Sequence, residues 1–317
     1  MLARKLNVTG RVVSIVLFIF CSLPLMCTCN GGPQVEQVGL SFLNDENNTY
    51  AVEFDTAVPE NCNLSKAVIV MSYGLSGSTY VSDVVGRPFV NNSYQGREAP
   101  NFGEIFGPTM RYMQRVRDPL KTMQNWLCKG HGQYISFKWK PAYWNNEYMK
   151  ALKWVAYHQI PVVYNVRNII DILLSSVKHE RKNNIPWRCG AQDENCIKTM
   201  KRHEKVYIDP TTLISKLEDA SHLLSDESIL GLLVRLKVHF IDVKYESLSS
   251  SDNEVRLRVW REVFEFISPE KNWDNLSVAD IHSSLAKTSS SSHKDKMKNY
   301  EQIRAILRGT RFASQLN

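Results

Sequence analysis

The feature that most constrains the fold is a short apolar run at residues 67–71, Ala-Val-Ile-Val-Met. A run of this length without a polar position is typical of a β-strand that is buried on both faces of a parallel sheet. Parallel strands are joined by crossover connections, which are usually helices. The run therefore predicts an α/β fold.

Further apolar or β-branched runs alternate with helical patterns along the chain. Strands are predicted at 134–138, 160–166 and 238–243, with an edge strand at 50–54. Apolar residues at helical spacing predict helices at 145–158, 169–178, 211–224, 227–236, 254–266 and 300–307. This order predicts a doubly wound parallel sheet with helices on both faces. The serine-rich run 288–293 predicts a mobile surface loop.

The N-terminal segment predicts a membrane anchor. Residues 12–29 carry no charge, and these 18 residues approach the length that spans a bilayer core. Arg4, Lys5 and Arg11 precede the stretch, and such positive charge favours a cytosolic N-terminus. A cleaved signal peptide is the alternative, because Pro24 can end an apolar h-region. We predict a cytosolic tail (1–11), a signal-anchor helix (12–29), a stem (30–65) and a lumenal domain (66–317).

Two further features agree with entry into the secretory pathway. Beyond the predicted anchor, sequons for N-glycosylation begin at Asn47, Asn63, Asn91 and Asn275. The cysteines beyond the anchor are Cys62, Cys128, Cys189 and Cys196. The polar stretch between Cys189 and Cys196 can close as a short disulfide loop, and the other two cysteines would then form a second bridge.

The charge of the chain suits anionic ligands. A formal net charge of +7 favours a nucleotide, an acidic glycan or a membrane surface as partner. The lysines and arginines are spread along the chain instead of forming one basic block, so we predict no nucleic-acid binding. The cysteine spacing offers too few ligands for zinc, so we predict no metal.

A turn rich in glycine, serine and threonine follows the first strand and comprises Ser76, Gly77, Ser78 and Thr79. Where a strand ends in such a turn at the start of a helix, backbone N–H groups and the helix dipole favour an anion. Gly77 allows a close backbone approach, and the hydroxyls of Ser78 and Thr79 add donors. An ordinary turn with a serine N-cap is the alternative. The turn lacks the lysine of a Walker A motif, which argues against a kinase.

A second candidate follows the strand at 160–166. Arg167 stands at the carboxyl end of this strand, and Ser175 lies two turns along the next helix. Both side chains could therefore face one phosphate group. The alternative is an ion pair between Arg167 and Asp171, with the serine on the helix surface.

Together these two segments resemble the sulfotransferases, which transfer a sulfuryl group from 3′-phosphoadenosine 5′-phosphosulfate (PAPS) to a hydroxyl or amine. Residues 76–80 are similar to the family's 5′-phosphosulfate loop, and Arg167 with Ser175 is similar to its 3′-phosphate motif. Residues 245–248, Tyr-Glu-Ser-Leu, resemble a Tyr-Glu-Asp-Leu segment, and residues 307–310 resemble the C-terminal segment of some members. The resemblance runs in the right order from residue 66 to residue 310.

The resemblance implies a P-loop-like fold, PAPS as co-substrate without a metal, and a set of nucleotide-binding residues. These residues are Ser76, Gly77, Ser78, Thr79, Tyr80, Arg167, Ser175, Tyr245, Arg308 and Gly309. It also implies a sulfotransferase of the Golgi membrane, single-pass and type II, that acts on a carbohydrate acceptor. A secreted protein is the alternative if the N-terminal segment is cleaved.

One position departs from the family pattern. The family carries Lys or Arg directly before the Ser-Gly dipeptide, and this chain has Leu75. Loss of a preorganised cation typically costs about 3–4 kcal/mol of transition-state stabilisation. The alternative is therefore a non-catalytic protein of the same fold that binds nucleotide or glycan without turnover. Lys138, Lys140 and Arg87 are the candidate substitutes for the missing cation.

A base must take the proton of the acceptor. We predict Glu104 as this base, because it lies among apolar residues at a distance after the turn that resembles Golgi-type members. His131 is the second candidate, although flanking glycines would hold its imidazole poorly. The acceptor is expected to bind in the segments 86–129 and 186–209.

Overall fold

The computed structural model describes much of the chain beyond residue 57. The described residues are 58, 62, 64–73, 76–87, 102–103, 118–128, 135–139, 146–180, 189–224, 229–283, 285 and 292–316. They belong to one compact unit, Val52–Asn317. The predicted anchor, the edge strand at 50–54, Leu75, Glu104, His131 and Lys140 lie outside the described residues. Within the described part of the chain, no helix has the length and hydropathy needed to cross a bilayer.

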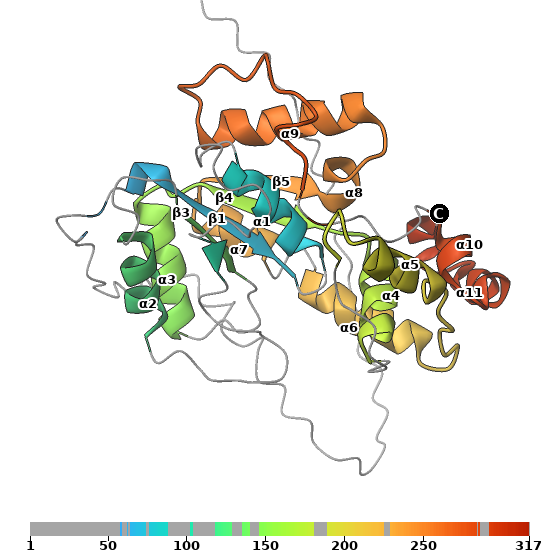
Figure 1. The fold of residues 1–317 in the computed structure, drawn as a ribbon. Helices are drawn as coiled ribbons and strands as arrows, with labels where there is room; N and C mark the ends of the chain where they lie inside the picture. Colours follow the sequence, from blue (N-terminus) through green and yellow to red (C-terminus); the bar gives the residue numbers. More distant parts are fainter. Residues whose placement is uncertain are drawn as a thin grey trace, which may run out of the picture. The chain divides into compact units, whose positions relative to one another are not determined.

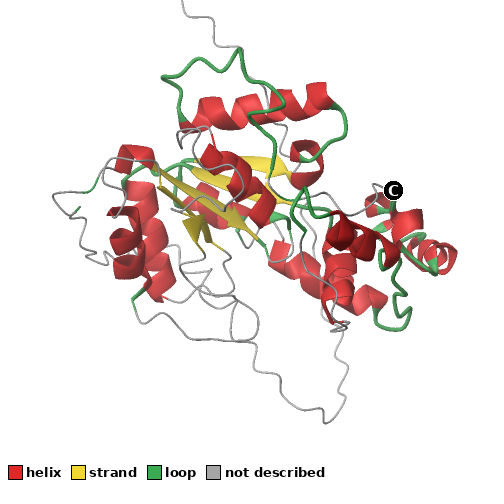
Figure 2. Ribbon diagram, viewed as in Figure 1, coloured by secondary structure: helices red, strands yellow, loops and turns green. Residues whose placement is uncertain are grey.

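Five strands form one sheet in which every neighbouring pair is parallel (Figure 2). The strands are β1 (Ala67–Ser72), β2 (Phe102–Gly103), β3 (Ile135–Trp139), β4 (Val162–Val166) and β5 (Phe240–Lys244). Their order across the sheet is β2-β3-β1-β4-β5. The predicted parallel α/β sheet is thus confirmed. The short edge strand β2 was not predicted, because two residues carry no pattern.

Helices cover both faces of this sheet (Figure 1). One face packs against α1 (Ser78–Gly86), α8 (Tyr245–Leu248) and α9 (Asn253–Ile267), and the other against α2 (Pro119–Leu127), α3 (Asn146–Tyr157) and α7 (Leu230–Arg235). Alternation along β1 explains the two layers, because side chains of successive residues point to opposite faces. Val68 and Val70 pack with the α1 and α9 cluster, whereas Ile69 and Met71 pack with the α2 and α3 cluster. The doubly wound arrangement is therefore confirmed.

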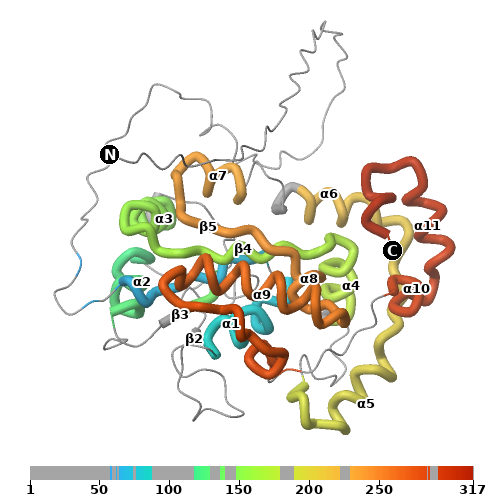
Figure 3. The backbone as a smooth tube through the Cα atoms, turned by 90° about the horizontal axis from the view of Figure 1, so that it is seen from above, coloured from blue at the N-terminus to red at the C-terminus, as the bar shows by residue number. Residues whose placement is uncertain are grey.

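The remaining helices gather around the segment that follows β4 (Figure 3). They are α4 (Ile169–Glu180), α5 (Glu194–Arg202), α6 (Leu213–Leu224), α10 (His293–Lys296) and α11 (Tyr300–Leu307). Apolar residues of α4, α6 and α11 share a third core cluster. A parallel bridge between Val206 and Met297 joins the segment after α5 to the end of α10. The C-terminal part of the chain therefore packs directly on α4.

The predicted helices are confirmed as α3, α4, α6, α7, α9 and α11, each with ends that differ by at most three residues from the prediction. The predicted mobile loop at 288–293 is wrong at its last residue. His293 begins α10 and is 1% exposed. The reason is a tertiary contact, since its Nε2 lies 3.4 Å from the carboxylate of Asp171.

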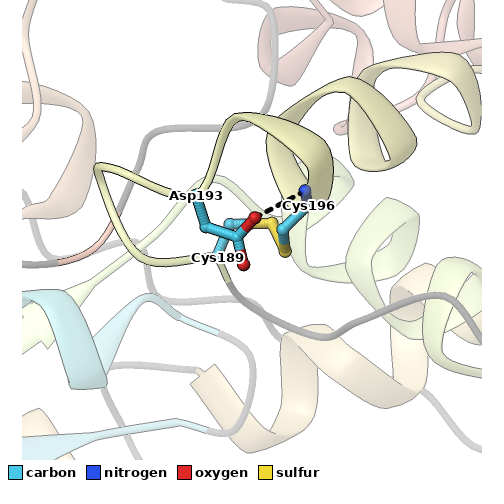
Figure 4. The surroundings of a disulfide bond; sticks show 3 residues. All are labelled: Cys189, Asp193 and Cys196. Carbon is cyan, nitrogen blue, oxygen red and sulfur yellow. Dashed lines mark hydrogen bonds between the residues drawn. A yellow bond between two sulfur atoms is a disulfide. The ribbon is translucent and has the colours of Figure 1, made fainter.

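Both predicted disulfides are present, Cys62–Cys128 and Cys189–Cys196. Cys62–Cys128 joins the segment before β1 to the end of α2. Cys189–Cys196 closes a loop onto the first turn of α5 (Figure 4). Asp193 caps this helix, because its Oδ1 accepts a hydrogen bond from the backbone N–H of Cys196 at 2.9 Å.

Candidate functional site

The two predicted anion-binding segments lie where the direction of strand connection reverses. β1 and β4 are neighbours, but the chain runs from β1 to the β2 edge of the sheet and from β4 to the β5 edge. In open α/β sheets, ligands bind outside the carboxyl ends of the strands at such a switch point. Residues 76–79 follow β1 and Arg167 follows β4. The topology therefore places both segments at the expected ligand crevice.

The turn after β1 is held by glycine and asparagine. Gly77 is the N-cap of α1, with φ 82° and no side-chain cap, so the serine N-cap alternative is wrong. Ser76 is fully buried, and its carbonyl oxygen and Oγ accept hydrogen bonds from Asn165 Nδ2 at 2.9 and 3.3 Å. Ser76 therefore fixes the turn against the end of β4. The backbone N–H groups of Ser78 and Thr79 have no acceptor inside the helix, because they belong to its first turn.

A lysine from the neighbouring strand β3 reaches the same turn. Lys138 Nζ donates to Thr79 Oγ1 at 3.4 Å, and its side chain is half-buried. Arg87, another candidate substitute for the cation missing at Leu75, stands instead at the far end of α1. Its guanidinium lies 3.4 Å from the carboxylate of Asp83. Among the described candidates, the turn thus has Lys138 as its cation.

Tyr245 joins the two candidate segments. The guanidinium carbon of Arg167 lies 4.8 Å from the centroid of the Tyr245 ring. On the other segment, a Cβ added to Gly77 would overlap the same ring, so only glycine fits there. The ring of Tyr80 meets Tyr245 edge-on, with centroids 5.9 Å apart. Burial raises the pKa of Tyr245, and the charge of Arg167 opposes this shift only in part.

Arg167 and Ser175 are brought together as predicted. Arg167 Nη1 donates to Ser175 Oγ at 3.3 Å, and this hydroxyl donates to the backbone carbonyl of Asp171 at 2.8 Å. The alternative ion pair between Arg167 and Asp171 is wrong. The Asp171 carboxylate contacts Lys296 Nζ at 2.8 Å and His293 Nε2 at 3.4 Å. Arg167 is therefore oriented toward the serine on the α4 face.

Asp171 carries its negative charge inside the protein. Burial by itself would raise its pKa. The hydrogen bond from Lys296, the nearby His293 and the charges of Arg167 and Lys296 outweigh burial and hold the pKa well below its ordinary value. The carboxylate thus stays charged and fixes Lys296, which is 4% exposed.

The other predicted site residues take different places. The hydroxyl of Tyr80 donates to the carbonyl of Leu248 at 2.9 Å, so Tyr80 packs α1 against α8. Gly309 follows α11 with φ 85° and, like Arg308, is exposed. The C-terminal segment is tied to the start of α4 by a bond from Asn168 Nδ2 to the Gln315 carbonyl at 2.8 Å. Neither Arg308 nor Gly309 takes part in that bond.

Two asparagines were missed by the sequence analysis. Asn165 bonds to Ser76, and the backbone N–H of Asn168 donates to Glu246 Oε1 at 2.8 Å. The available signal was a buried polar residue, Asn165, inside an otherwise apolar strand. As to metal sites, no group of three or more His, Cys, Asp or Glu in the described part of the chain could hold an ion.

No protein-family model matches the chain, and no curated protein matches it. Among solved structures, it is similar to mouse sulfotransferase SULT7A1 complexed with PAP, at 13% sequence identity and a TM-score of 0.33. The match covers 68% of this chain and 62% of that sulfotransferase. The chain thus spans less than two thirds of that protein. A likeness of this degree assigns neither a family nor an activity to the chain.

Proposed function

We propose that the chain transfers a sulfuryl group from PAPS to a hydroxyl or amine of a carbohydrate acceptor. The observation that carries the proposal is the shared contact of Arg167 and Gly77 with the ring of Tyr245. It supports two anion-binding groups close together at one switch point. A nucleotide with phosphate groups on both its 5′ and 3′ positions has two anionic ends that fit such a pair.

The residues present fit the two ends of this nucleotide. At one end, the first-turn N–H groups of Ser78 and Thr79 are donors for the phosphosulfate, and Lys138 Nζ lies at the same turn. At the other end, Arg167 and Ser175 converge from a loop and a helix within 3.3 Å of each other. Arginine with a hydroxyl is a donor set that suits a phosphate.

In the proposed reaction, the acceptor oxygen attacks sulfur and the bond between sulfur and the bridging phosphate oxygen breaks. Negative charge builds on that bridging oxygen, and a preorganised cation beside it lowers the barrier. Lys138 fills this role in our proposal, in place of the residue that is Leu75 here. Glu104 remains our proposed base. It directly follows β2 in the chain, and the last residue of β2, Gly103, pairs with Phe137 in the middle of β3.

The second candidate is a non-catalytic protein that keeps the nucleotide or glycan site, which Leu75 favours. Both candidates are tested by isothermal titration of the full chain in detergent with 3′-phosphoadenosine 5′-phosphate (PAP). We expect binding that is lost in Arg167→Met and kept in Arg258→Met, an exposed arginine on α9. No heat at millimolar PAP contradicts the sulfotransferase and the nucleotide-binding form of the second candidate, and leaves only a glycan-binding protein.

Transfer of radiolabelled sulfate from PAPS to a panel of glycans then separates the candidates. We expect label in at least one glycan with the wild type and none with Glu104→Gln. An inactive wild type that gains activity as Leu75→Arg identifies the non-catalytic protein. Binding of ATP without preference for the 3′-phosphorylated nucleotide would instead indicate a kinase.

We also propose that the domain faces the Golgi lumen, held by a type II anchor at 12–29. Two features support an oxidising compartment. Both disulfides are of the kind that persists there, and the sequon residue Asn275 is exposed in a turn. Protease protection of the domain in intact vesicles, with a mass shift on deglycosylation, tests this topology. Digestion without detergent contradicts it.

A further inference from the structure

The face of α4 that carries Ser175 also carries a lysine. Asp171, Ser175 and Lys178 follow each other at spacings of four and three residues, and Arg167 stands four residues earlier. Residues at such spacings lie on one side of a helix. Because Arg167 Nη1 contacts Ser175 Oγ at 3.3 Å, this side of α4 is the one that faces the guanidinium. Lys178 thus follows Ser175 by one turn on the same face, and its side chain is half-buried.

Within the part of the chain that the structure describes, the charges that act on Lys178 add up, with its own charge, to a positive surplus. The cations Arg167 and Lys296 and the carboxylates Asp171 and Glu204 act on its ammonium group. With Lys178 itself, three cations face two carboxylates, before any charge on His293 is counted. The carboxylate of Asp171 is already in contact with Lys296 at 2.8 Å. Among the described residues, an anion on this face would therefore meet more cations than carboxylates.

The environment disfavours the charged form of Lys178. Burial is the largest effect and lowers its pKa. Among the nearby charges, Glu204 opposes burial most strongly, Lys296 and Arg167 lower the pKa further, and Asp171 raises it. A doubly negative ligand between Lys178 and Arg167 would offset burial and the effect of the two cations, because opposite charges favour the ionised amine. Lys296 is a poor candidate for the same role, since it is 4% exposed and its ammonium is held by Asp171.

We propose that Lys178 is a further residue of the 3′-phosphate subsite, and that it makes the site select a phosphate monoester over a free 3′-hydroxyl. This inference rests on the proposed function. A phosphate monoester carries a charge of about −1.5 to −2 at pH 7. One guanidinium balances about one of these charges, and a second cation on the same face is needed for the rest. Lys178 supplies that cation from one helical turn beyond Ser175.

The test is a comparison of two nucleotides by isothermal titration of the full chain in detergent. PAP and adenosine 5′-phosphate (AMP) differ only in the 3′-phosphate. We expect Lys178→Met to weaken PAP binding at least about tenfold, the effect of one lost charge-assisted contact, and to leave AMP binding unchanged. Lys178→Arg should restore most of the PAP affinity. Lys153→Met, a half-buried lysine on α3, is the matched control and should change neither affinity.

The outcomes separate this inference from the proposed function. If the wild type prefers PAP to AMP and Lys178→Met keeps the full preference, the role of Lys178 is overturned and the proposed function stands. If Lys178→Met weakens both nucleotides equally, the residue acts on the fold of the site and its selective role is also overturned. If the wild type binds no PAP, both proposals fail. Thermal unfolding without ligand shows whether Lys178→Met is folded, and Lys178→Gln is the second variant if it is not.

Discussion

Replacing Gly77 with alanine tests whether the turn after β1 is locked against the ring of Tyr245. The left-handed φ of 82° at Gly77 costs an L-residue about 1–2 kcal/mol. The added Cβ would also overlap three ring atoms of Tyr245. This ring has little room to move, because Arg167 lies over it and Tyr80 meets it edge-on. Overpacking of this kind costs about 1–3 kcal/mol, so we expect a total loss of about 2–5 kcal/mol.

Gly309 offers a matched control for this substitution. Its φ of 85° is nearly the same, but no atom lies within 4 Å of an added Cβ. Gly309→Ala should therefore carry only the backbone cost of about 1–2 kcal/mol. The free energy of unfolding is measured for both variants by urea denaturation, followed by tryptophan fluorescence. The excess loss at Gly77 over Gly309 is the part that we assign to the tyrosine ring.

A second background isolates the ring itself. In a Tyr245→Ala protein, Gly77→Ala should cost no more than Gly309→Ala does, because the overlapping atoms are gone. The difference between the two backgrounds is a direct measure of the coupling between residues 77 and 245. Equal losses at the two glycines, or an excess that persists without the ring, would refute the packing of Tyr245 against the turn. The proposed pairing of the two anion-binding segments would then lose its structural link.

Three further predictions concern charge and covalent links. Lys138→Met should lower sulfate transfer about a hundredfold to a thousandfold with less change in PAP affinity, and equal losses in both would contradict a role at the transferred group. The low pKa of Asp171 means that its carboxylate stabilises the fold above about pH 4 and that this contribution is lost as the pH falls further. Asp171→Asn should therefore lower the free energy of unfolding by about 3–5 kcal/mol at neutral pH, because Lys296 stays buried without its partner. Urea denaturation at several pH values should show that this variant loses less stability toward acid pH than the wild type does. Asp171→Asn with Lys296→Met should recover most of the loss. Removing Cys62–Cys128 should lower the free energy of unfolding in urea by about 4 kcal/mol, and removing Cys189–Cys196 should lower it by about 2.5 kcal/mol. The difference is expected because the bridges span 66 and 7 residues. A larger loss for the shorter loop would contradict this explanation by chain entropy.

The sheet could be predicted because its central strands are buried on both faces. All six residues of β1 are buried, and only the last residue of β4 is less than fully buried. Burial on both sides demands a continuous apolar run, and such a run is visible in the sequence without any partner. The anion-binding turn could be predicted for a similar reason. The position of Gly77 at φ 82° is a local requirement that glycine satisfies.

The elements that were missed carry weaker local signals. The helix α2 is an exception, because Asp118 caps it, Pro119 is its first residue, and Leu120, Met123 and Leu127 follow at helical spacing. Only four residues form α10, so no period can be counted. Its placement comes from the contact of Lys296 with Asp171, 125 residues earlier in the chain. A buried ion pair of this separation leaves no pattern in either segment alone.

The position of Arg167 illustrates how the site depends on such distant contacts. Asn165, two residues before it, donates to Ser76 across 89 residues. Asn168 directly follows Arg167, and its backbone N–H donates to Glu246, 78 residues later in the chain. The side chain of Asn168 donates to the carbonyl of Gln315, 147 residues later. The backbone on both sides of Arg167 is thus held by contacts with the turn after β1, with α8 and with the C-terminal segment. A substitution at Asn165 or Asn168 should therefore move Arg167 relative to the turn, although neither side chain is proposed to contact a ligand. Residue types and spacing could thus suggest the two anion-binding groups, but the distance between these groups depends on contacts between segments that are far apart in the sequence.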